Sequence, residues 1–531
     1  MSFFSGLNAE SYDRQYSDRE LLVRIARYFR PQRRALVVIA LTLLVNSGMV
    51  ALLPVVVSHS IDLLKPQMDI LAVYLLSGAI LLIGLVRWCS NWILRRVSSR
   101  AIADVVLSLA QDAFQAATGH DLSFYDEYSS GRILSRITGD TRDFGQLISL
   151  TTDLVAQVAE ALILGVVLVN IEWRLCLYIF ALIPIVLLLS ISYRRLARTV
   201  TRRGMQAMAE VNATIKETVS GISVAKNFRQ ENSIYTDFQR ANDLSYRVNV
   251  QRGLTLSVVF PTLNTLGGVA AAFLVYVGGA NVMQGTITAG AWYLFILSLD
   301  SFLYPIMSLS SFFTQVQTGL AAAERVFALI DAAPAVVQTD HLPTPRLEGA
   351  IDFEDVSFRY KDAEPVLAHF HLHIAAGETL AVVGHTGAGK SSVAKLIARF
   401  YDFQDGCIRV DGQDVRTFDL ESYRRQLGVV SQVPFLFSGT VADNIRYARG
   451  EASDAEIAAI ATQIGHGEWL ETLPQGLATE VGERGSQLSM GQRQLVSLMR
   501  VLVQRPAVFI LDEATASIDP FTEHQIQEAL N

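Results

Sequence analysis

Residues 384–391 read Gly-His-Thr-Gly-Ala-Gly-Lys-Ser, and they lie between two segments with different patterns. The apolar run 380–383 before them predicts a strand, and residues 392–400 after them predict a helix. Glycines let backbone N–H groups turn inward toward an anion, and a helix N-terminus adds the positive end of its dipole. A glycine-rich loop between a strand and a helix, closed by Lys-Ser, is the pattern of a phosphate-binding P-loop.

The loop predicts a site for a nucleoside triphosphate and Mg²⁺. Lys390 is placed to reach the outer phosphates, and the Ser391 hydroxyl is placed to ligate Mg²⁺. A chance match in a loop is the alternative, and the flanking strand and helix argue against it. The candidate nucleotide contacts are Gly384, His385, Thr386, Gly387, Ala388, Gly389, Lys390, Ser391 and Ser392.

The composition indicates more than one domain, with part of the chain in a membrane. The chain has 531 residues, too many for one ordinary core, and 51% of them are hydrophobic. The net charge of −7 is small for this length and predicts no nucleic-acid partner. The cysteines, Cys89, Cys176 and Cys407, are far apart, and their spacing predicts neither a disulfide framework nor a metal site.

Residues 1–34 are expected to form a polar, cytoplasmic N-terminus. Within them, residues 19–30 space apolar side chains at helical intervals among arginines. This pattern suits an amphipathic helix that lies at a membrane surface, and it suits an ordinary surface helix nearly as well.

Residues 35–331 are expected to form a transmembrane domain of six α-helical spans. Each span reaches the roughly 20 residues needed to cross a hydrocarbon layer about 30 Å thick. Arginines cluster at one side of the spans, so the positive-inside rule places both termini in the cytoplasm. The predicted spans are residues 35–58, 70–93, 148–171, 173–193, 254–283 and 288–315.

The two longest intervals between these spans are polar, helical in pattern and too long for plain loops. We expect cytoplasmic extensions of the spanning helices, each turning through a short helix, near residues 120–136 and 215–228. Such tips are suited to contact a cytoplasmic domain, and the alternative is that they are only exposed helix ends.

Three ionisable residues, Arg87, Glu160 and Asp300, fall inside the predicted spans. Charged groups in a hydrocarbon layer are costly and usually face a cavity or a partner. They indicate either a path for a polar or cationic substrate, or an internal ion pair, or residues that lie nearer the interface than the predicted spans place them.

Residues 332–349 contain three prolines and little periodicity, which predicts a linker. From residue 350 the pattern changes to short strands alternating with helices, so residues 350–531 are expected to form an α/β P-loop NTPase domain. A strand predicted over residues 353–360 ends at Tyr360. That ring is placed to stack on a purine, and a core tyrosine is the alternative.

Two acids follow the strand predicted at residues 508–511. Asp512 is placed to hold Mg²⁺ through water, and Glu513 is placed to orient and deprotonate an attacking water. In the same domain as a P-loop, this pair indicates hydrolysis of a triphosphate. Gln432 also follows a predicted strand and is a candidate to sense Mg²⁺ and the water.

A second anion site is predicted before the helix at residues 493–502, because a serine and a glycine at a helix N-terminus can hold an anion. It is separate in sequence from the P-loop, so one nucleotide can be clamped between two copies of the domain. The candidate residues are Ser489, Gly491 and Gln492.

With these motifs in place, the chain resembles the half-transporters of the ABC exporter family, in which one membrane domain is fused to one ATPase domain. The resemblance covers essentially the whole chain and implies that ATP and Mg²⁺ bind. Around the nucleotide, residues 384–391 resemble the Walker A loop, residues 512–513 the Walker B end, Tyr360 the adenine-stacking aromatic and Gln432 the Q-loop residue. Residues 488–492 resemble the signature motif and residues 517–519 the D-loop. Residues 480–485 resemble the exporter-specific segment that meets the coupling helices.

The resemblance also implies partners and location. It implies a second half-transporter, a lipid bilayer and a small amphiphilic substrate of multidrug or lipid type, exported across a bacterial inner membrane, with the ATPase domain in the cytoplasm. The alternatives are a nucleotide-binding subunit that gates a partner transporter and an exporter-shaped importer, such as one for siderophores.

The chain departs from the family pattern in two places. Met490 stands where the family usually has glycine, and a side chain there crowds the approach to a γ-phosphate. The site that Met490 completes is expected to hydrolyse ATP poorly, whereas Glu513 is intact in this chain's own half of a site. This asymmetry favours a heterodimer, with a homodimer as the alternative. The family's switch histidine follows one further strand, and His524 comes too early to be that residue. We therefore expect the ATPase domain at 350–531 to be C-terminally incomplete.

Overall fold

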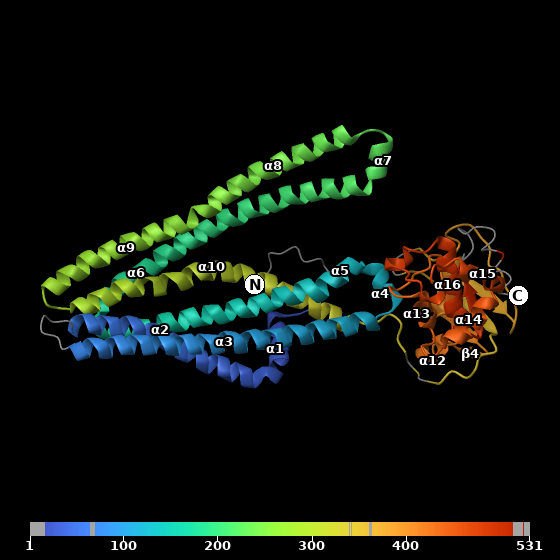
Figure 1. Cartoon of the computed structure of the whole chain (residues 1–531), viewed down its shortest axis with the longest axis horizontal. Coiled ribbons are helices and arrows are strands. Elements are labelled where there is room, and N and C mark those ends of the chain that lie inside the picture. Colours follow the sequence, from blue (N-terminus) through green and yellow to red (C-terminus); the bar gives the residue numbers. More distant parts are fainter. Residues whose placement is uncertain are drawn as a thin grey trace. The chain divides into compact units, whose positions relative to one another are not determined.

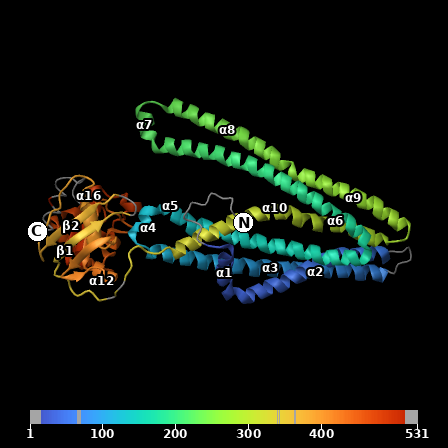
Figure 2. The same cartoon turned by 180° about the vertical axis from the view of Figure 1, so that it is seen from behind.

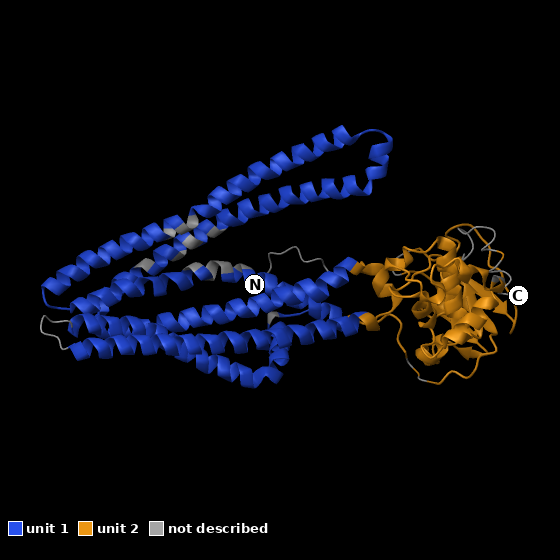
Figure 3. Ribbon diagram, in the orientation of Figure 1, with its two compact units in different colours: residues 1–117, 131–331 blue, residues 118–130, 332–531 orange. Residues whose placement is uncertain are grey.

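The computed structural model describes residues 16–63, 70–338, 340, 342–360, 364–512 and 524. The chain divides into two compact units (Figure 3). Unit 1 contains residues 1–117 and 131–331, and unit 2 contains residues 118–130 and 332–531. The predicted residues Glu513 and 517–519 lie outside the part that the structure describes.

Unit 1 is built from long helices (Figure 1). Its main elements are α1 (Asp18–Phe29), α2 (Arg33–Leu63), α3 (Ile70–Gly119), α5 (Ser130–Ser135), α6 (Thr141–Ser220), α7 (Ile222–Asn227), α8 (Glu231–Ser257), α9 (Val259–Met283) and α10 (Ala289–Asp331). A 3₁₀ turn, η1 (Arg30–Gln32), joins α1 to α2, and a π-helical turn, η2 (Arg136–Asp140), precedes α6.

The predicted helix at residues 19–30 is confirmed as α1. Ser17 begins it with a capping box, in which its hydroxyl accepts from the Glu20 backbone N–H and the Glu20 carboxylate accepts from the Ser17 backbone N–H. The Arg24 guanidinium donates to the carboxylate of Asp331, the last residue of α10. This ion pair ties the first helix to the end of the last helix of the unit.

The described residues contain five helical stretches that are long and apolar enough to cross a membrane. One of them contains both predicted spans 148–171 and 173–193, because α6 continues through both. Its two arms meet at Glu172, whose backbone is not helical (φ −155°, ψ 97°). The count of six spans therefore stays a prediction.

Buried apolar side chains from α2, α6, α9 and α10 form the core of unit 1. The two arms of α6 contribute Leu164 and Ile179, and α10 contributes Phe295, each at most 2% exposed. Near the other end of α10, the Arg325 guanidinium donates to the Asp140 carboxylate at 2.5 and 2.9 Å. The helices are thus joined by apolar packing within the predicted spans and by an ion pair beyond them.

Both polar intervals turn through short helices, as predicted. The second interval turns at α7 in unit 1, and the first turns at α4 (Leu122–Glu127), which belongs to unit 2. The Asp121 side chain caps α4 by accepting from the Ser123 backbone N–H at 3.0 Å.

The described residues of unit 2 form two sheets, and Figure 2 shows strands β1 and β2 of the larger one. The larger sheet is antiparallel with the order β2-β1-β3-β4, and the smaller one pairs β5 and β6 in parallel, with Leu427 opposite Val508. The strands are β1 (Ile351–Phe358), β2 (Leu367–Ile374), β3 (Asp405–Val410), β4 (Gln413–Asp414), β5 (Leu427–Val430) and β6 (Val508–Leu511).

Helices and two hydrophobic clusters complete unit 2. One cluster packs α11 against β1 and β3, and the other packs α13, α14 and α16 together. The helices are α11 (Lys390–Ile397), α12 (Leu420–Arg424), α13 (Val441–Arg446), α14 (Asp454–Thr462), α15 (Glu468–Glu471) and α16 (Met490–Gln504). Short 3₁₀ turns lie at η3 (Gly465–Gly467), η4 (Gly476–Ala478) and η5 (Glu483–Gly485).

Two strand predictions are corrected by the structure. Residues 380–383 do not form a strand, and the side chain of Val383 is 88% exposed. A strand needs a neighbouring strand to exchange backbone hydrogen bonds with. Here β5 and β6 pair with each other and not with residues 380–383. In addition, β1 ends at Phe358, so Tyr360 lies two residues beyond the sheet.

Candidate nucleotide site

The loop before α11 has the backbone that its glycines predict. Gly387 and Gly389 have φ values of 88° and 89°, in the left-handed region that side chains rarely adopt. A Cβ at Gly389 would also lie 3.1 Å from Cγ1 of Val366. Gly389 is therefore required both by its backbone and by the space around it.

Lys390 begins α11 and folds back over the loop. Its Nζ donates to the Gly384 carbonyl oxygen at 2.7 Å and to the His385 carbonyl oxygen at 3.4 Å. The ammonium group is thereby held against the same loop whose N–H groups are suited to bind phosphate. A cation at this position can neutralise the outer phosphates of a triphosphate.

Ser391 and Asp512 are 121 residues apart in sequence and meet in the structure. The Ser391 hydroxyl donates to Oδ1 of Asp512 at 2.8 Å. Asp512 is held in place because its backbone N–H donates to the Val430 carbonyl oxygen at 3.0 Å and so extends the β5–β6 ladder. Two oxygen ligands side by side, one of them a carboxylate, fit the preference of Mg²⁺.

Gln432 lies at the same edge of the parallel sheet. It follows β5 by two residues, as Asp512 follows β6 directly, and parallel strands end at a common edge. The structure therefore brings three of the predicted residues to one region: Ser391, Gln432 and Asp512.

Tyr360 lies beside the loop helix, partly buried. Its hydroxyl is 3.0 Å from the Ser392 hydroxyl, and its ring lies edge-on to the rings of Phe358 and Tyr401 at 4.8 and 5.1 Å. Lys395 of α11 places its Nζ 5.4 Å from the centre of the Tyr360 ring. The ring is thus both part of a core cluster and adjacent to the P-loop helix.

The second predicted anion site is a well-capped helix start. Ser489 caps α16, with its hydroxyl accepting from the Gln492 N–H at 3.2 Å and the Gln492 side chain accepting from the Ser489 N–H at 2.9 Å. Gly491 is buried, and the Met490 side chain is 38% exposed. Within the described residues, none of the side-chain hydrogen bonds of Ser489 and Gln492 reaches residues 384–392.

Sequence reasoning expected the helix tip near residues 120–136 to contact a cytoplasmic domain, but it did not identify the residues through which α4 contacts the rest of unit 2. The Tyr401 hydroxyl donates to the Asp126 carboxylate, and the Asp121 carboxylate accepts from the backbone N–H groups of Ala335 and Val336 at 2.5 and 2.9 Å. Burial and the bond to Asp126 raise the pKa of Tyr401. Burial acts to raise the pKa of Asp121, but its hydrogen bonds outweigh burial and lower it. Residues 275 positions apart give no local signal of such a contact.

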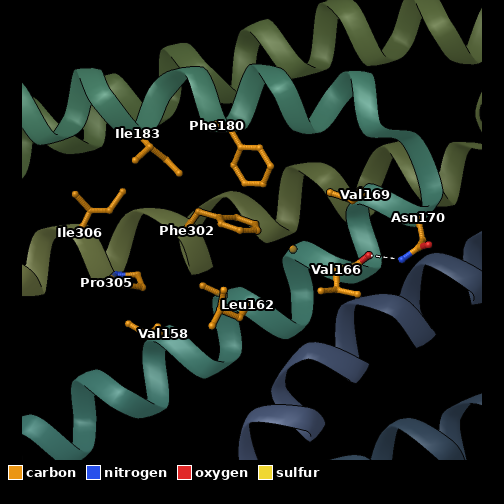
Figure 4. A pocket seen from close by; sticks show the side chains of 12 residues that line it. Val158, Leu162, Val166, Val169, Asn170, Phe180, Ile183, Phe302, Pro305 and Ile306 are labelled. Atoms are coloured by element: carbon orange, nitrogen blue, oxygen red, sulfur yellow. Dashed lines mark hydrogen bonds between the residues drawn. The ribbon is translucent and has the colours of Figure 1, made fainter.

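The membrane unit contains a cavity of about 510 Å³ between the two arms of α6 and α10. Figure 4 shows Phe180 from α6 and Phe302 from α10 beside it, and the two rings meet edge-on at 6.3 Å. Asn170 is the polar residue in the lining, and its side chain donates to the Val166 carbonyl oxygen at 2.7 Å. The cavity is therefore suited to an apolar group.

The two predicted intramembrane acids lie on neighbouring parts of this unit. The Ser301 hydroxyl donates to Glu160 at 2.9 Å, which links α10 to α6. Asp300 lines a second cavity, of about 380 Å³, together with Asn264 and Tyr304. Asp300 lies eleven residues into α10, a rise of about 16 Å, which is close to half of a hydrocarbon layer about 30 Å thick.

Comparison with known proteins identifies the family. The profile described as ABC transporter transmembrane region matches residues 36–306, and the profile described as ABC transporter matches residues 367–516. An uncharacterized ABC transporter ATP-binding protein of Bacillus subtilis is 33% identical over 521 residues, which cover 96% of this chain and 85% of the relative.

Two further relatives have names that state an activity. The ATP-dependent lipid A-core flippase of Desulfotalea psychrophila is 29% identical over 520 residues, covering 97% of this chain and 90% of the relative. The fatty acid ABC transporter ATP-binding/permease protein of Mycobacterium tuberculosis is 31% identical over 440 residues, covering 83% and 70%. The chain therefore belongs to the ABC transporter family, as an exporter-type half-transporter that fuses a transmembrane domain to the ATPase domain that drives transport.

Proposed function

We propose that this chain is one half of a dimeric transporter that uses Mg²⁺-dependent ATP hydrolysis to export amphiphilic compounds of lipid or multidrug type across a bacterial inner membrane. The observation that carries the proposal is the 2.8 Å hydrogen bond between the Ser391 hydroxyl and the Asp512 carboxylate. This bond joins the hydroxyl and the carboxylate that correspond to the family's Mg²⁺ ligands. Both groups lie next to the P-loop, over which the Lys390 side chain folds. The two named relatives, a lipid A-core flippase and a fatty acid transporter, support an amphiphilic substrate.

Each residue has a part in the proposed hydrolysis. When bound, Mg²⁺ supplies positive charge that neutralises the phosphate oxygens. Lys390 binds the outer phosphates, while Ser391 and Asp512 would hold Mg²⁺. Tyr360 stacks on the adenine ring. Glu513 comes directly after Asp512 in the sequence, and it takes the proton of the attacking water while Gln432 orients that water.

The proposed dimer completes the site, because Ser489, Gly491 and Gln492 of one chain reach the nucleotide held by the P-loop of the other. Met490 is the exposed first residue of α16, so we expect its side chain to crowd a phosphate oxygen that approaches the helix N-terminus. The site completed by Met490 then hydrolyses slowly, which favours a different chain as the partner. ATP closes the pair because it binds the closed state better than the open one.

Two cavities among the described residues of the membrane unit support a substrate with an apolar and a polar part. The cavity beside Phe180 and Phe302 accommodates an acyl chain or an aromatic group. Asp300 offers a carboxylate near the middle of the membrane, where an amine-bearing compound can offset the cost of its charge. Cationic and zwitterionic amphiphiles are therefore the preferred class.

The test uses the chain with its partner subunit in lipid nanodiscs. Glu513→Gln should reduce ATP turnover by about 100-fold or more, because the general base is lost, while ATP still binds. Turnover is measured as released phosphate, and binding is measured with a fluorescent ATP analogue. A variant that hydrolyses ATP at the wild-type rate would refute the role of Glu513.

A second candidate function is a regulatory subunit that binds ATP and gates a partner without a substrate of its own. The exposed Met490 side chain at the start of α16, where the family usually has glycine, is the observation that favours it. ATPase rates measured with a panel of amphiphiles discriminate the two functions. Stimulation that disappears when Lys390→Ala is introduced supports the exporter, and a rate that no amphiphile changes supports the regulator.

A further inference from the structure

A chain of side-chain contacts in unit 2 leads from the P-loop helix to α4. The first link is Tyr360, whose hydroxyl lies 3.0 Å from that of Ser392, the third residue of α11. Its ring stands at 87° to the ring of Tyr401, with 5.1 Å between the ring centres. Lys395 places its Nζ 5.4 and 5.5 Å from the centres of these two rings, so the same cation faces both.

The second link is Tyr401, which is 6% exposed and has its hydroxyl bonded to the Asp126 carboxylate on α4. A hydrogen bond to a charged acceptor is stronger than one between neutral groups. The Tyr401 ring packs edge-on against Tyr360 and Phe358, at 5.1 and 6.0 Å between ring centres, so the position of its hydroxyl depends on these two rings.

Arg399 fixes the segment that carries Tyr401. Its side chain is 1% exposed, and it donates to the Val337 carbonyl oxygen at 2.9 Å and to the Asp402 carboxylate at 3.0 Å. Its backbone is left-handed, with φ of 47°, a conformation that costs free energy for any residue with a side chain. A buried arginine in such a conformation indicates that its side-chain bonds compensate for the strain.

The same segment therefore holds both the linker and α4. Arg399 holds residue 337, Tyr401 holds Asp126, and Asp121 holds the N–H groups of residues 335 and 336. Residues 120–121 join α3 to α4, and residues 128–129 join α4 to α5.

We propose that Tyr401 is a positioning residue that couples stacking of the nucleotide base on Tyr360 to the position of α4. This inference rests on the proposed function, since it takes Tyr360 as the base-stacking residue. A base stacked on Tyr360 fixes that ring, the ring fixes Tyr401, and the Tyr401 hydroxyl fixes α4. The identity of the base then affects coupling as well as binding.

The experiment places a spin label at Glu127→Cys, an exposed position on α4, in the chain with Cys89, Cys176 and Cys407 replaced and its partner present. Glu513→Gln is included to prevent turnover. We expect ATP to reduce the mobility of the label. CTP, compared at equal occupancy, should reduce it less, because a pyrimidine stacks over a smaller area.

Tyr401→Phe keeps the ring and removes the hydroxyl. We expect it to reduce the ATP-induced change in mobility by about tenfold, the effect of one charge-assisted hydrogen bond, while ATP affinity stays within about twofold. Asp126→Ala should have the same effect, and the double variant should be no worse than either single one. Tyr447→Phe is the control, because that hydroxyl belongs to an exposed ring after α13.

The outcomes separate this inference from the proposed function. Loss of ATP binding in the unsubstituted chain would refute the proposed function itself. If ATP binds but Tyr401→Phe responds like Tyr447→Phe, the coupling role of Tyr401 is wrong. If CTP and ATP change the label equally at equal occupancy, base stacking is not the signal. Additive effects of Tyr401→Phe and Asp126→Ala would show that the two side chains act independently.

Discussion

At the scale of single residues, the nucleotide site depends on backbone positions that accept only glycine. Gly389 has a left-handed backbone, and a Cβ atom added to it would lie 3.1 Å from the Val366 side chain. Gly377 has a left-handed backbone but open space around it, and Gly450 has open space without a left-handed backbone. Alanine substitutions at these three positions therefore distinguish destabilisation by backbone strain from destabilisation by steric contact.

Gly389→Ala should lower the free energy of unfolding by about 1–3 kcal/mol and weaken ATP binding, since strain and contact act together. Gly377→Ala should cost less, and Gly450→Ala should be close to neutral. Thermal unfolding of the full chain in detergent measures all three. A Gly389→Ala variant that is as stable as Gly377→Ala would show that the loop relaxes around the added methyl group.

Met490 occupies the N-terminus of α16, where the proposed partner site meets the nucleotide. Met490→Gly should raise the ATPase rate of the dimer at least about threefold, because it opens the N-terminus of α16 to a phosphate oxygen. Phosphate release by the complex measures this. Met499→Leu, inside the buried face of α16, is the control for a general effect of replacing methionine. An unchanged rate with Met490→Gly would mean that the side chain does not limit hydrolysis.

At the scale of elements, sequence patterns predicted the helices better than the strands. A long apolar or periodic segment fixes a helix through bonds within the segment itself, so α2, α3, α9 and α10 follow from the sequence. A strand needs a partner that the segment does not contain, and residues 380–383 were wrongly predicted for that reason. The contact between Ser391 and Asp512 was predictable because both residues belong to nucleotide-binding motifs. The contact between Tyr401 and Asp126 was not predictable, because no sequence motif links these two residues.

The attachment of α4 should be sensitive to acid. Hydrogen bonds lower the pKa of Asp121 despite its burial, so its contribution to stability is present above the ordinary carboxyl pKa of about 4 and is lost as pH falls through the lower folded value. Asp121→Asn should therefore lower the melting temperature at pH 7, and this difference should shrink steadily as the pH falls from about 4 to about 2. Asp237→Asn on α8, an exposed partner of Arg240, should change little at any of these pH values. A difference for Asp121→Asn that persists undiminished in acid would contradict this reasoning.

At the scale of the whole molecule, the arrangement of the spans follows from where α6 reverses. Two predicted spans meet at Glu172, while the far end of α6 reaches Ser220 and α7. If each arm crosses the membrane once, Glu172 and Gly221 lie on opposite sides.

Single cysteines in a background without Cys89, Cys176 and Cys407 test this arrangement. Glu172→Cys should react with a membrane-impermeant maleimide in intact cells, and Gly221→Cys should react only after permeabilisation. Labelling is read by gel shift, with Asn227→Cys at the end of α7 as a second inward-facing control. Equal labelling of residues 172 and 221 in intact cells would rule out two crossings.

The bond between Ser391 and Asp512 ties the P-loop helix to the end of β6. Each oxygen group has a partner in the other, so a cation that binds between them first has to separate them. Phosphate oxygens carried in with the cation would offset that cost. We therefore expect Mg²⁺ to bind this pair more tightly together with ATP than alone.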